Sequence, residues 1–183
     1  MTKASRHHIR DLIERIARIS AADEWSDDLN PSQWTALSYL ARANRFSRAP
    51  SHVAEFMAAT RGTVSQTLKA LARKGLIEEM RSETDRRWIS YSITETGTET
   101  LSRSMVINDL YDGLDQSVAG PLADGLEALL RNALKARDKR PFGLCKTCRH
   151  HKKKRTGGFC MLLNEELARD ETFQICYEHQ HAA

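Results

Sequence analysis

The stretch TRGTVSQTLKALARKGLIEEMRSETDRRWISYSITETG, residues 60–97, decides the fold because the spacing of its apolar residues changes part-way along. Over 61–74 the apolar residues recur with the period of a helix, which places Val64, Leu68 and Leu71 on one face. Beyond this helix the period falls to two, as in a strand with one buried face. The chain therefore passes from a helix directly into extended structure.

The starts of the helices can be placed from the residues that cap them. Asn30, followed by a proline and by Gln33, has the form of a capping box, and Thr60 can cap the helix that follows it. Gly75 is expected to end that helix in a left-handed conformation. Ser51 is the expected cap of a short helix that precedes Thr60. Two helices joined by a tight turn result.

The extended part predicts a β-hairpin. Residues 76–81 and 88–94 form its strands, and the polar, basic segment 82–87 forms its tip. Helix, turn, helix and hairpin together make a winged helix, so the predicted fold class is mainly α with a small β-hairpin wing. The aromatic residues expected to pack in the core or hairpin, rather than to stack on bases, are Trp34, Trp88 and Tyr91.

Longer amphipathic helices flank this unit. One lies near the N-terminus, and a break at Gly120-Pro121 is expected to separate two more downstream. Each apolar stripe needs a partner surface. The stripes comprise Ile9, Leu12, Ile13 and Ile16; Leu101, Met105, Leu110 and Leu114; and Leu122, Leu126, Leu129, Leu130 and Leu134.

Composition limits the classes of protein. The balance of 40% hydrophobic and 28% charged residues is that of a soluble globular protein, and a net charge of +4 favours an anionic partner. An enzyme is not expected, because no base, nucleophile and orienting group occur together at any motif spacing. The polar N-terminus predicts neither a signal peptide nor a membrane span, so a cytoplasmic location is expected.

All four cysteines of the chain lie in its C-terminal quarter, at Cys145, Cys148, Cys160 and Cys176. In a reducing compartment structural disulfides are not expected, and thiolates gathered in one module predict a soft-metal site with these four ligands. The alternative, buried small hydrophobic residues, fits poorly with the basic and polar residues around the first pair. A metal centre is therefore predicted in this module.

The spacing leaves open which centre the cysteines hold. Structural zinc sites commonly use two short pairs, whereas Cys160 and Cys176 are single ligands. Iron–sulfur clusters accept this unevenness, so a cluster is the preferred interpretation, 4Fe-4S before 2Fe-2S, and zinc is the alternative. Because four cysteines suffice, the nearby histidines are expected on the surface. These are His150, His151, His179 and His181.

Short motifs in the winged-helix region occur in the order and spacing of a known family. They are TVSQ at 63–66, LARKGLI at 71–77, DRR at 85–87 and ITETG at 93–97. On these motifs residues 37–97 resemble the MarR-type winged helix regulators, and the flanking helices extend the resemblance over about 5–138. The family's wing usually begins with Asp-Pro, where this chain has Ser82-Glu83.

The resemblance implies a homodimer with interlocking terminal helices, in which each recognition helix enters a major groove of a pseudo-palindromic double-stranded DNA operator. It implies a sequence-specific transcriptional regulator, with repression the expected direction and no membrane partner. Together with the change of composition near Arg140-Pro141, it divides the chain into two parts. These are a winged helix DNA-binding and dimerisation domain, 1–138, and a cysteine-rich module, 139–183.

The outward face of the second helix supplies candidate DNA contacts. Gln66 can bond adenine at two positions, and small hydroxyls can approach base edges. Lys69 and Arg73 are expected at phosphates, and Arg86 and Arg87 on the wing in the minor groove. The candidates at or near base edges are Arg61, Thr63, Ser65 and Gln66.

A hypothesis links the two parts. Because the cysteine module follows the last dimerisation helix, assembly or loss of its centre would move that helix and change the separation of the recognition helices, which has to match a DNA turn of about 34 Å. A coupling of about 1 to 3 kcal/mol would change DNA affinity roughly 5- to 150-fold. In the zinc alternative the site is constitutive, and the signal is a small ligand between the dimer helices or thiol oxidation.

Overall fold

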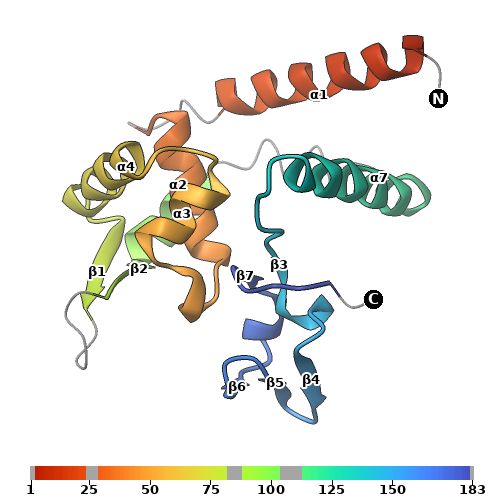
Figure 1. Cartoon of the computed structure of the whole chain (residues 1–183). Helices are drawn as coiled ribbons and strands as arrows, with labels where there is room; N and C mark the ends of the chain where they lie inside the picture. The colour runs from red at the N-terminus through yellow and green to blue at the C-terminus, as the bar shows by residue number, and fades with distance from the viewer. Residues whose placement is uncertain (1–2, 24–28, 82–87, 104–112, 182–183) are drawn as a thin grey trace.

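Helices predominate in the computed structural model, which describes residues 3–23, 29–81, 88–103 and 113–181 (Figure 1). A winged-helix body, residues 29–103, carries two long helices at its side, and a cysteine module, residues 139–181, lies at the bottom of this view. The predicted class, mainly α with a hairpin wing, is confirmed. The helices are α1 (Lys3–Asp23), α2 (Pro31–Arg42), α3 (Pro50–Phe56), α4 (Arg61–Arg73), α5 (Glu95–Arg103) and α7 (Gln116–Lys135).

The strands form small antiparallel sheets in both parts. In the body β1 (Ile77–Arg81) pairs with β2 (Ile89–Ile93) as the predicted hairpin. In the module β3 (Gly143–Leu144) pairs with β7 (Ile175–Cys176), and three further strands form a meander. The meander is β4 (His151–Lys154), β5 (Gly157–Cys160) and β6 (Glu165–Leu167), and the short 3-10 turns are η1 (Arg45–Ser47), η2 (Cys145–Thr147) and η3 (Glu171–Phe173).

Two of the predicted helix caps are present. The backbone N–H of Gln33 donates to Asn30 Oδ1 at 2.9 Å, and the Gln33 side chain accepts from the Asn30 backbone, so α2 begins with the expected capping box. At α4 the backbone N–H of Thr63 donates to Thr60 Oγ1 at 3.2 Å. Gly75 follows this helix at φ +70°, in the left-handed region.

The prediction that Ser51 caps a helix is wrong. Helix α3 starts at Pro50, with Ala49 in the cap position and no side-chain cap bond, so Ser51 lies inside the first turn. Proline suits this start because its fixed φ is helical and it lacks the N–H that the first turn would leave without a partner.

The predicted break at Gly120-Pro121 is also wrong, because α7 runs through it. The helix begins earlier than expected, at Gln116, and is capped by Asp115, whose carboxylate accepts from the backbone N–H of Ser117 at 2.7 Å. Pro121 then falls in the second turn, where it removes one backbone donor from a helix already started. Met105 and Leu110, expected on the preceding stripe, lie outside the described residues.

The core of the winged-helix body contains the predicted faces of its helices. The three apolar residues of α4 are buried, as are Leu37 and Leu40 of α2 and Val53 of α3. Gly97 closes this core, because a Cβ at that position would lie 2.2 Å from the carbonyl oxygen of Leu76. The first turn of α5 can therefore lie directly against residue 76, which joins α4 to β1.

The cysteine module is packed against the body and adds to its core. Ala43, directly after α2, forms a parallel bridge with Ile175 of β7, and Ile175 belongs to the buried cluster of the body. Phe142 and Leu144 pack against the same cluster, and the Phe142 ring makes edge contacts with Tyr39 and Phe56. The two parts of the sequence therefore share apolar packing.

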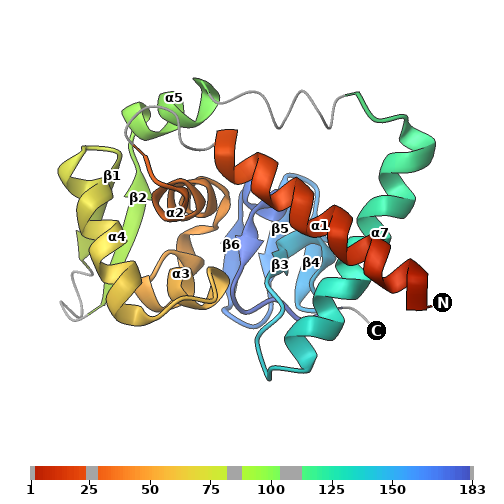
Figure 2. The same ribbon diagram turned by 90° about the horizontal axis from the view of Figure 1, so that it is seen from above.

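The apolar stripes of the two long helices are left uncovered. Seen from above, α1 and α7 lie outside the winged-helix body, at its edge (Figure 2). The α1 stripe, at Ile9, Leu12, Ile13 and Ile16, is 36–56% exposed. On α7 the exposed apolar residues are Val118, Leu122, Leu126, Leu129 and Leu130.

Candidate nucleic-acid interface and cysteine site

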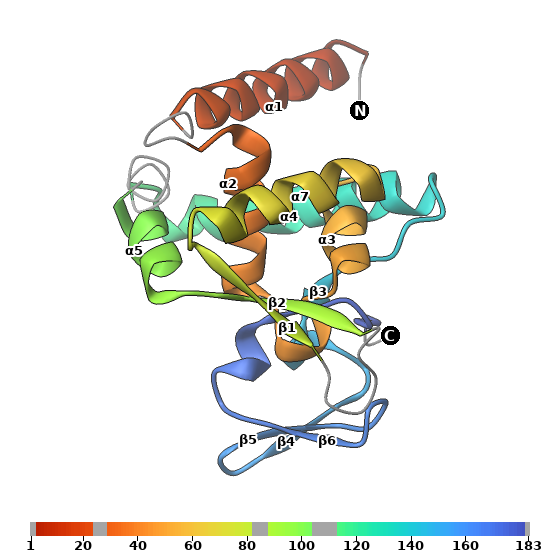
Figure 3. The ribbon, with the colours of Figure 1, turned by 90° about the vertical axis from the view of Figure 1, so that its left-hand side faces the viewer.

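The outward face of α4 carries the candidate DNA contacts. Helix α4 lies on the outside of the body, in front of α2 in Figure 3. Ser65 is half-buried, and the other candidates on this helix are exposed. A basic and polar strip thus runs along the helix on the side opposite its buried apolar face. The exposed members are Arg61, Thr63, Gln66, Lys69 and Arg73.

Thr63 has a structural task as well. Its hydroxyl lies 2.9 Å from that of Thr60, and its backbone N–H and C=O are bonded to Thr60 and to the Thr67 hydroxyl. These bonds fix the first turn of α4. Thr63 therefore sets the angle at which the neighbouring side chains project.

A groove of about 390 Å³ lies beside the start of α4. Trp88, at the foot of the wing, lines it and is 58% exposed, so the prediction that this ring packs in the core or hairpin is wrong. The alternation along β2 explains the exposure, since Tyr91 is the buried residue of that strand. Sequence reasoning missed Ser51 and Trp88 as groove residues. The complete lining is Ala49, Pro50, Ser51, Arg61, Trp88 and Ile89.

The base of the wing is held by a carboxylate on β1. Glu79 accepts from Arg81 Nε at 2.8 Å and from the Tyr91 hydroxyl at 3.1 Å. These two hydrogen bonds, with that from Arg81 the stronger, lower the pKa of Glu79. Arg86 and Arg87, the candidates on the wing tip, lie outside the described residues.

The four cysteines line one small cavity. Cys145 and Cys148 come from the η2 turn, where the Cys148 N–H donates to the Cys145 carbonyl at 3.0 Å, while Cys160 ends β5 and Cys176 ends β7. All four are free thiols, and the cavity measures about 10 Å³. Within the described ranges, no set of three or more His, Cys, Asp or Glu side chains has the arrangement of a bound metal's ligands.

Hydrogen bonds hold the sulfurs in place. Asn44 Nδ2 donates to Cys145 Sγ at 3.2 Å, and the Gln180 N–H donates to Cys148 Sγ at 3.4 Å. A hydrogen bond from Cys145, helped by Asn44, lowers the pKa of Cys176 to about 6, whereas the same bond and burial raise the pKa of Cys145. The hydrogen bond within this pair thus favours the thiolate at Cys176, the form of cysteine that binds metals.

Three of the four histidines expected on the surface are at least partly buried. His179 is 2% exposed, its Nε2 lies 3.0 Å from Thr147 Oγ1, and its Nδ1 has no hydrogen-bond partner among the described residues. Burial lowers the pKa of His179. His150 and His151 are half-buried and line the cysteine cavity. The prediction holds only for His181, which is exposed.

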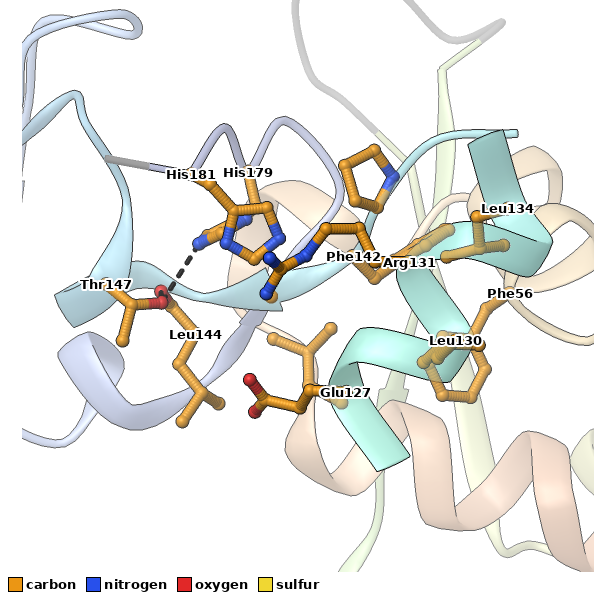
Figure 4. A pocket seen from close by; sticks show the side chains of 13 residues that line it. Phe56, Glu127, Leu130, Arg131, Leu134, Phe142, Leu144, Thr147, His179 and His181 are labelled. Atoms are coloured by element: carbon orange, nitrogen blue, oxygen red, sulfur yellow. Dashed lines mark hydrogen bonds between the residues drawn. The ribbon is translucent and has the colours of Figure 1, made fainter. Parts of the chain in front are cut away.

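A second cavity, of about 250 Å³, lies between α7 and the module (Figure 4). Leu130, Leu134 and Phe142 give it apolar walls. Its polar lining includes Glu127, Arg131 and His179. This combination of an apolar wall with few polar groups is typical of small-molecule sites. Gly143, also on the lining, makes room for the His179 ring, because a Cβ there would lie 2.6 Å from it.

Residues 27–87 match the sequence model of the MarR family. Solved structures with the MarR-type winged helix fold also resemble the chain. FabT of Streptococcus pneumoniae in complex with DNA has a TM-score of 0.57 at 20% identity, over 73% of this chain and 98% of FabT. The transcriptional regulator BldR from Sulfolobus solfataricus has a TM-score of 0.56 at 20% identity, over 72% and 99%.

The MepR–DNA complex of S. aureus is similar too, with a TM-score of 0.55 at 20% identity, over 72% of this chain and 98% of MepR. At these identities the likeness establishes the MarR-type fold. About a quarter of this chain lies outside each of the three comparisons. Comparison with curated proteins gave no match. No helix within the described ranges has the length and apolar character to cross a membrane.

Proposed function

We propose that the protein is a MarR-type transcriptional regulator that binds a specific DNA operator as a homodimer and is not an enzyme. The observation that carries this proposal is the exposed polar and basic face of α4, set on a winged helix beside a groove at the foot of the wing. The DNA-bound state of FabT and MepR, which share the fold, supports it. Repression is the expected direction.

The homodimer is supported by the uncovered stripes of α1 and α7. Apolar residues at helical spacing on two neighbouring helices would be covered by the same surfaces of a second copy, as in an isologous interface. The dimer places two α4 helices on one face, which suits a pseudo-palindromic operator. Analytical ultracentrifugation of Leu126→Glu, on the exposed α7 stripe, should show monomers where the unmodified protein shows dimers.

DNA binding is tested by selection of an operator from random duplexes, followed by affinity measurements. Gln66→Ala should weaken the free energy of operator binding by about 1–3 kcal/mol and relax the sequence preference at one base pair. Lys69→Ala should weaken binding to all sequences and reduce the salt slope by about one. Lys153→Ala removes an exposed lysine of β4 in the module and is the matched control. It should bind DNA as the unmodified protein does. A selection that returns no preferred sequence contradicts the proposal.

We further propose that the four cysteines hold one inorganic centre that controls DNA affinity. The convergence of the four sulfurs on one cavity supports a shared centre. An iron–sulfur cluster is supported by the uneven spacing and by the N–H donors to sulfur, which tune cluster potentials. Zinc is supported by the cavity's size, because one tetrahedral ion fits where a four-iron cube would push the sulfurs apart.

Iron, sulfide and zinc contents and visible absorption after oxygen-free purification separate these two centres. The proposed control of DNA affinity is then tested by comparing operator affinity of the metal-loaded protein with that of Cys148→Ser. Equal affinities would show that the centre does not control DNA binding. Protein that contains neither metal nor sulfide and still binds its operator would remove the centre altogether.

A second candidate for the input signal is a small ligand in the cavity between α7 and the module. Arg131 beside an apolar wall suits a compact molecule with a carboxylate, and the zinc site would then be structural. Benzoate is a suitable probe. It should change operator affinity of the unmodified protein and leave that of Arg131→Ala unchanged.

A further inference from the structure

Asn44 lies where α2 gives way to the η1 turn, and it is only 1% exposed. Its Oδ1 accepts from the Phe46 N–H at 3.2 Å and from the Ser47 hydroxyl at 2.7 Å, which shapes the turn. Its Nδ2 donates to Cys145 Sγ, 101 residues further along the chain. One buried amide is therefore bonded to the turn at its oxygen and to a sulfur of the cysteine site at its nitrogen.

The same turn is joined to the second buried cysteine. The N–H of Tyr177, directly after Cys176, donates to Ser47 Oγ at 2.8 Å, and the backbone N–H of Asn44 donates to the Ile175 carbonyl at 2.9 Å. Cys176 is thus flanked on both sides by bonds to η1. Phe46, in the middle of the turn, packs against the buried cysteines.

From η1 the connection continues into the DNA-binding helices. Helix α3 begins three residues after the turn, and it packs on α4. Tyr177 adds two contacts to α3, a ring stack on His52 at 3.8 Å between centroids and a hydrogen bond from its hydroxyl to Glu55 at 3.1 Å. A displacement of the cysteines would therefore displace α3, and with it the start of α4.

We propose that Asn44 is the positioning residue through which occupancy of the cysteine site sets the position of α3 and α4 on DNA. This inference rests on the proposed function. A centre bound to Cys145 and Cys176 fixes both sulfurs and so fixes the amide and the turn; without it the sulfurs regain rotational freedom and η1 loses that constraint. The element biased in this way is the α3–α4 pair.

This route differs from movement of the last dimerisation helix. It runs through residues 44–47 on the DNA-binding side of the protein, and it needs no displacement of α7. Substitution of Asn44 therefore abolishes the response if the signal passes through this residue, and leaves the response intact if the signal passes through α7.

The test compares operator affinity of metal-loaded and metal-free protein for the unmodified chain and for Asn44→Ser. Serine keeps a capping oxygen for the Phe46 N–H but is too short to reach Cys145. The unmodified protein should change affinity by at least about fivefold, and Asn44→Ser by less than about twofold. Circular dichroism and metal analysis should show that the variant is folded and loaded.

Arg45→Gln is the matched control, because Arg45 lies on the same turn but its hydrogen bonds go to Glu165, Glu171 and the Glu166 carbonyl, not to a cysteine. It should respond as the unmodified protein does. Sulfur-to-metal charge-transfer absorption gives a second readout, which Asn44→Ser should shift and Arg45→Gln should not. Ser47→Ala removes the hydroxyl that accepts from the Tyr177 N–H and donates to Asn44 Oδ1, but it leaves the Asn44 bond to Cys145 in place. It should reduce the response in part and serves if Asn44→Ser is unstable.

Three results would overturn the inference. A full response in Asn44→Ser shows that the signal takes another path, and loss of the response in Arg45→Gln as well shows that only docking of the module matters. The third result is failure of the proposed function itself. In that case the unmodified protein holds no metal, or binds DNA equally well with and without the metal, and the inference fails too.

Discussion

The winged-helix body and the cysteine module are stabilised in different ways. In the body α2, α3 and α4 contribute fully buried side chains, among them Leu37, Leu40 and Leu71 at 0% exposure. In the module the buried cluster consists of Leu167 with Cys145 and Cys176, and Phe173 is 57% exposed. The body is held by burial of apolar surface, whereas the module depends on its sulfurs and on contacts with the body.

The largest expected effect is that of removing the inorganic centre. Structural zinc contributes about 10–16 kcal/mol of binding free energy in small metal-dependent folds, more than the apolar core of this module supplies. Chelation should therefore abolish hydrogen-exchange protection in β4 and β5 while α2 and α4 remain protected. Equal protection of β4 and β5 before and after chelation would show that the module folds without a metal.

Next in size is Leu71→Ala in the body. Truncation of this fully buried side chain should lower the free energy of unfolding by about 2–5 kcal/mol, because it removes apolar contacts and leaves a cavity. Urea denaturation measures the change. Leu162→Ala in the module, where the side chain is 44% exposed, is the control and should change it by less than about 0.5 kcal/mol.

A pair of glycine substitutions compares the backbone of the two regions. Gly75→Ala should lower the free energy of unfolding of the body by about 1–3 kcal/mol. The cause is backbone strain at a φ of +70° and not a steric clash, because the space around a Cβ at this position is open. At Gly157 the φ is +123° and a Cβ would lie 2.2 Å from the Leu167 carbonyl oxygen, so alanine should separate β5 from β6 and weaken metal retention. Chelator competition and thermal unfolding measure these effects. A Gly157→Ala protein that retains metal normally would show that the β5–β6 pairing does not support the site.

The smallest effect is expected at an exposed ion pair within the module, between Arg140, which precedes β3, and Glu178, which follows β7. Arg140 Nη1 lies 2.7 Å from Glu178, and both side chains are well exposed to solvent. Arg140→Gln should therefore change stability by less than about 1 kcal/mol, and less still in high salt. A larger loss in thermal unfolding would mean that this pair stabilises the module more than its exposure indicates.

Local rules were sufficient to predict much of the fold. The caps at Asn30 and Thr60, the left-handed Gly75 and the buried face of α4 each depend on a few neighbouring residues, so periodicity and capping predicted them. Pro121 was misjudged, because a proline is tolerated once a capped helix has started upstream of it.

The site was less predictable, because it depends on contacts between distant residues. The sequence predicted that the four cysteines belong together, but nothing local to Asn44 indicates that it meets Cys145. The burial of His179 and the exposure of Trp88 likewise depend on which surfaces pack together. The histidines were expected on the surface because four cysteines suffice as ligands, whereas packing against Gly143 buries His179.

The bridge between Ala43 and Ile175 has a consequence for biosynthesis. At a translation rate of about 5–20 residues per second, on the order of ten seconds pass between the synthesis of Ala43 and that of Ile175. Throughout that time the nascent polypeptide exposes an apolar surface around the end of α2. Residues near Ile175, which are synthesised last, cover this surface in the folded protein. A transcript cut short before codon 175 should therefore yield a chaperone client rather than a smaller stable winged-helix protein.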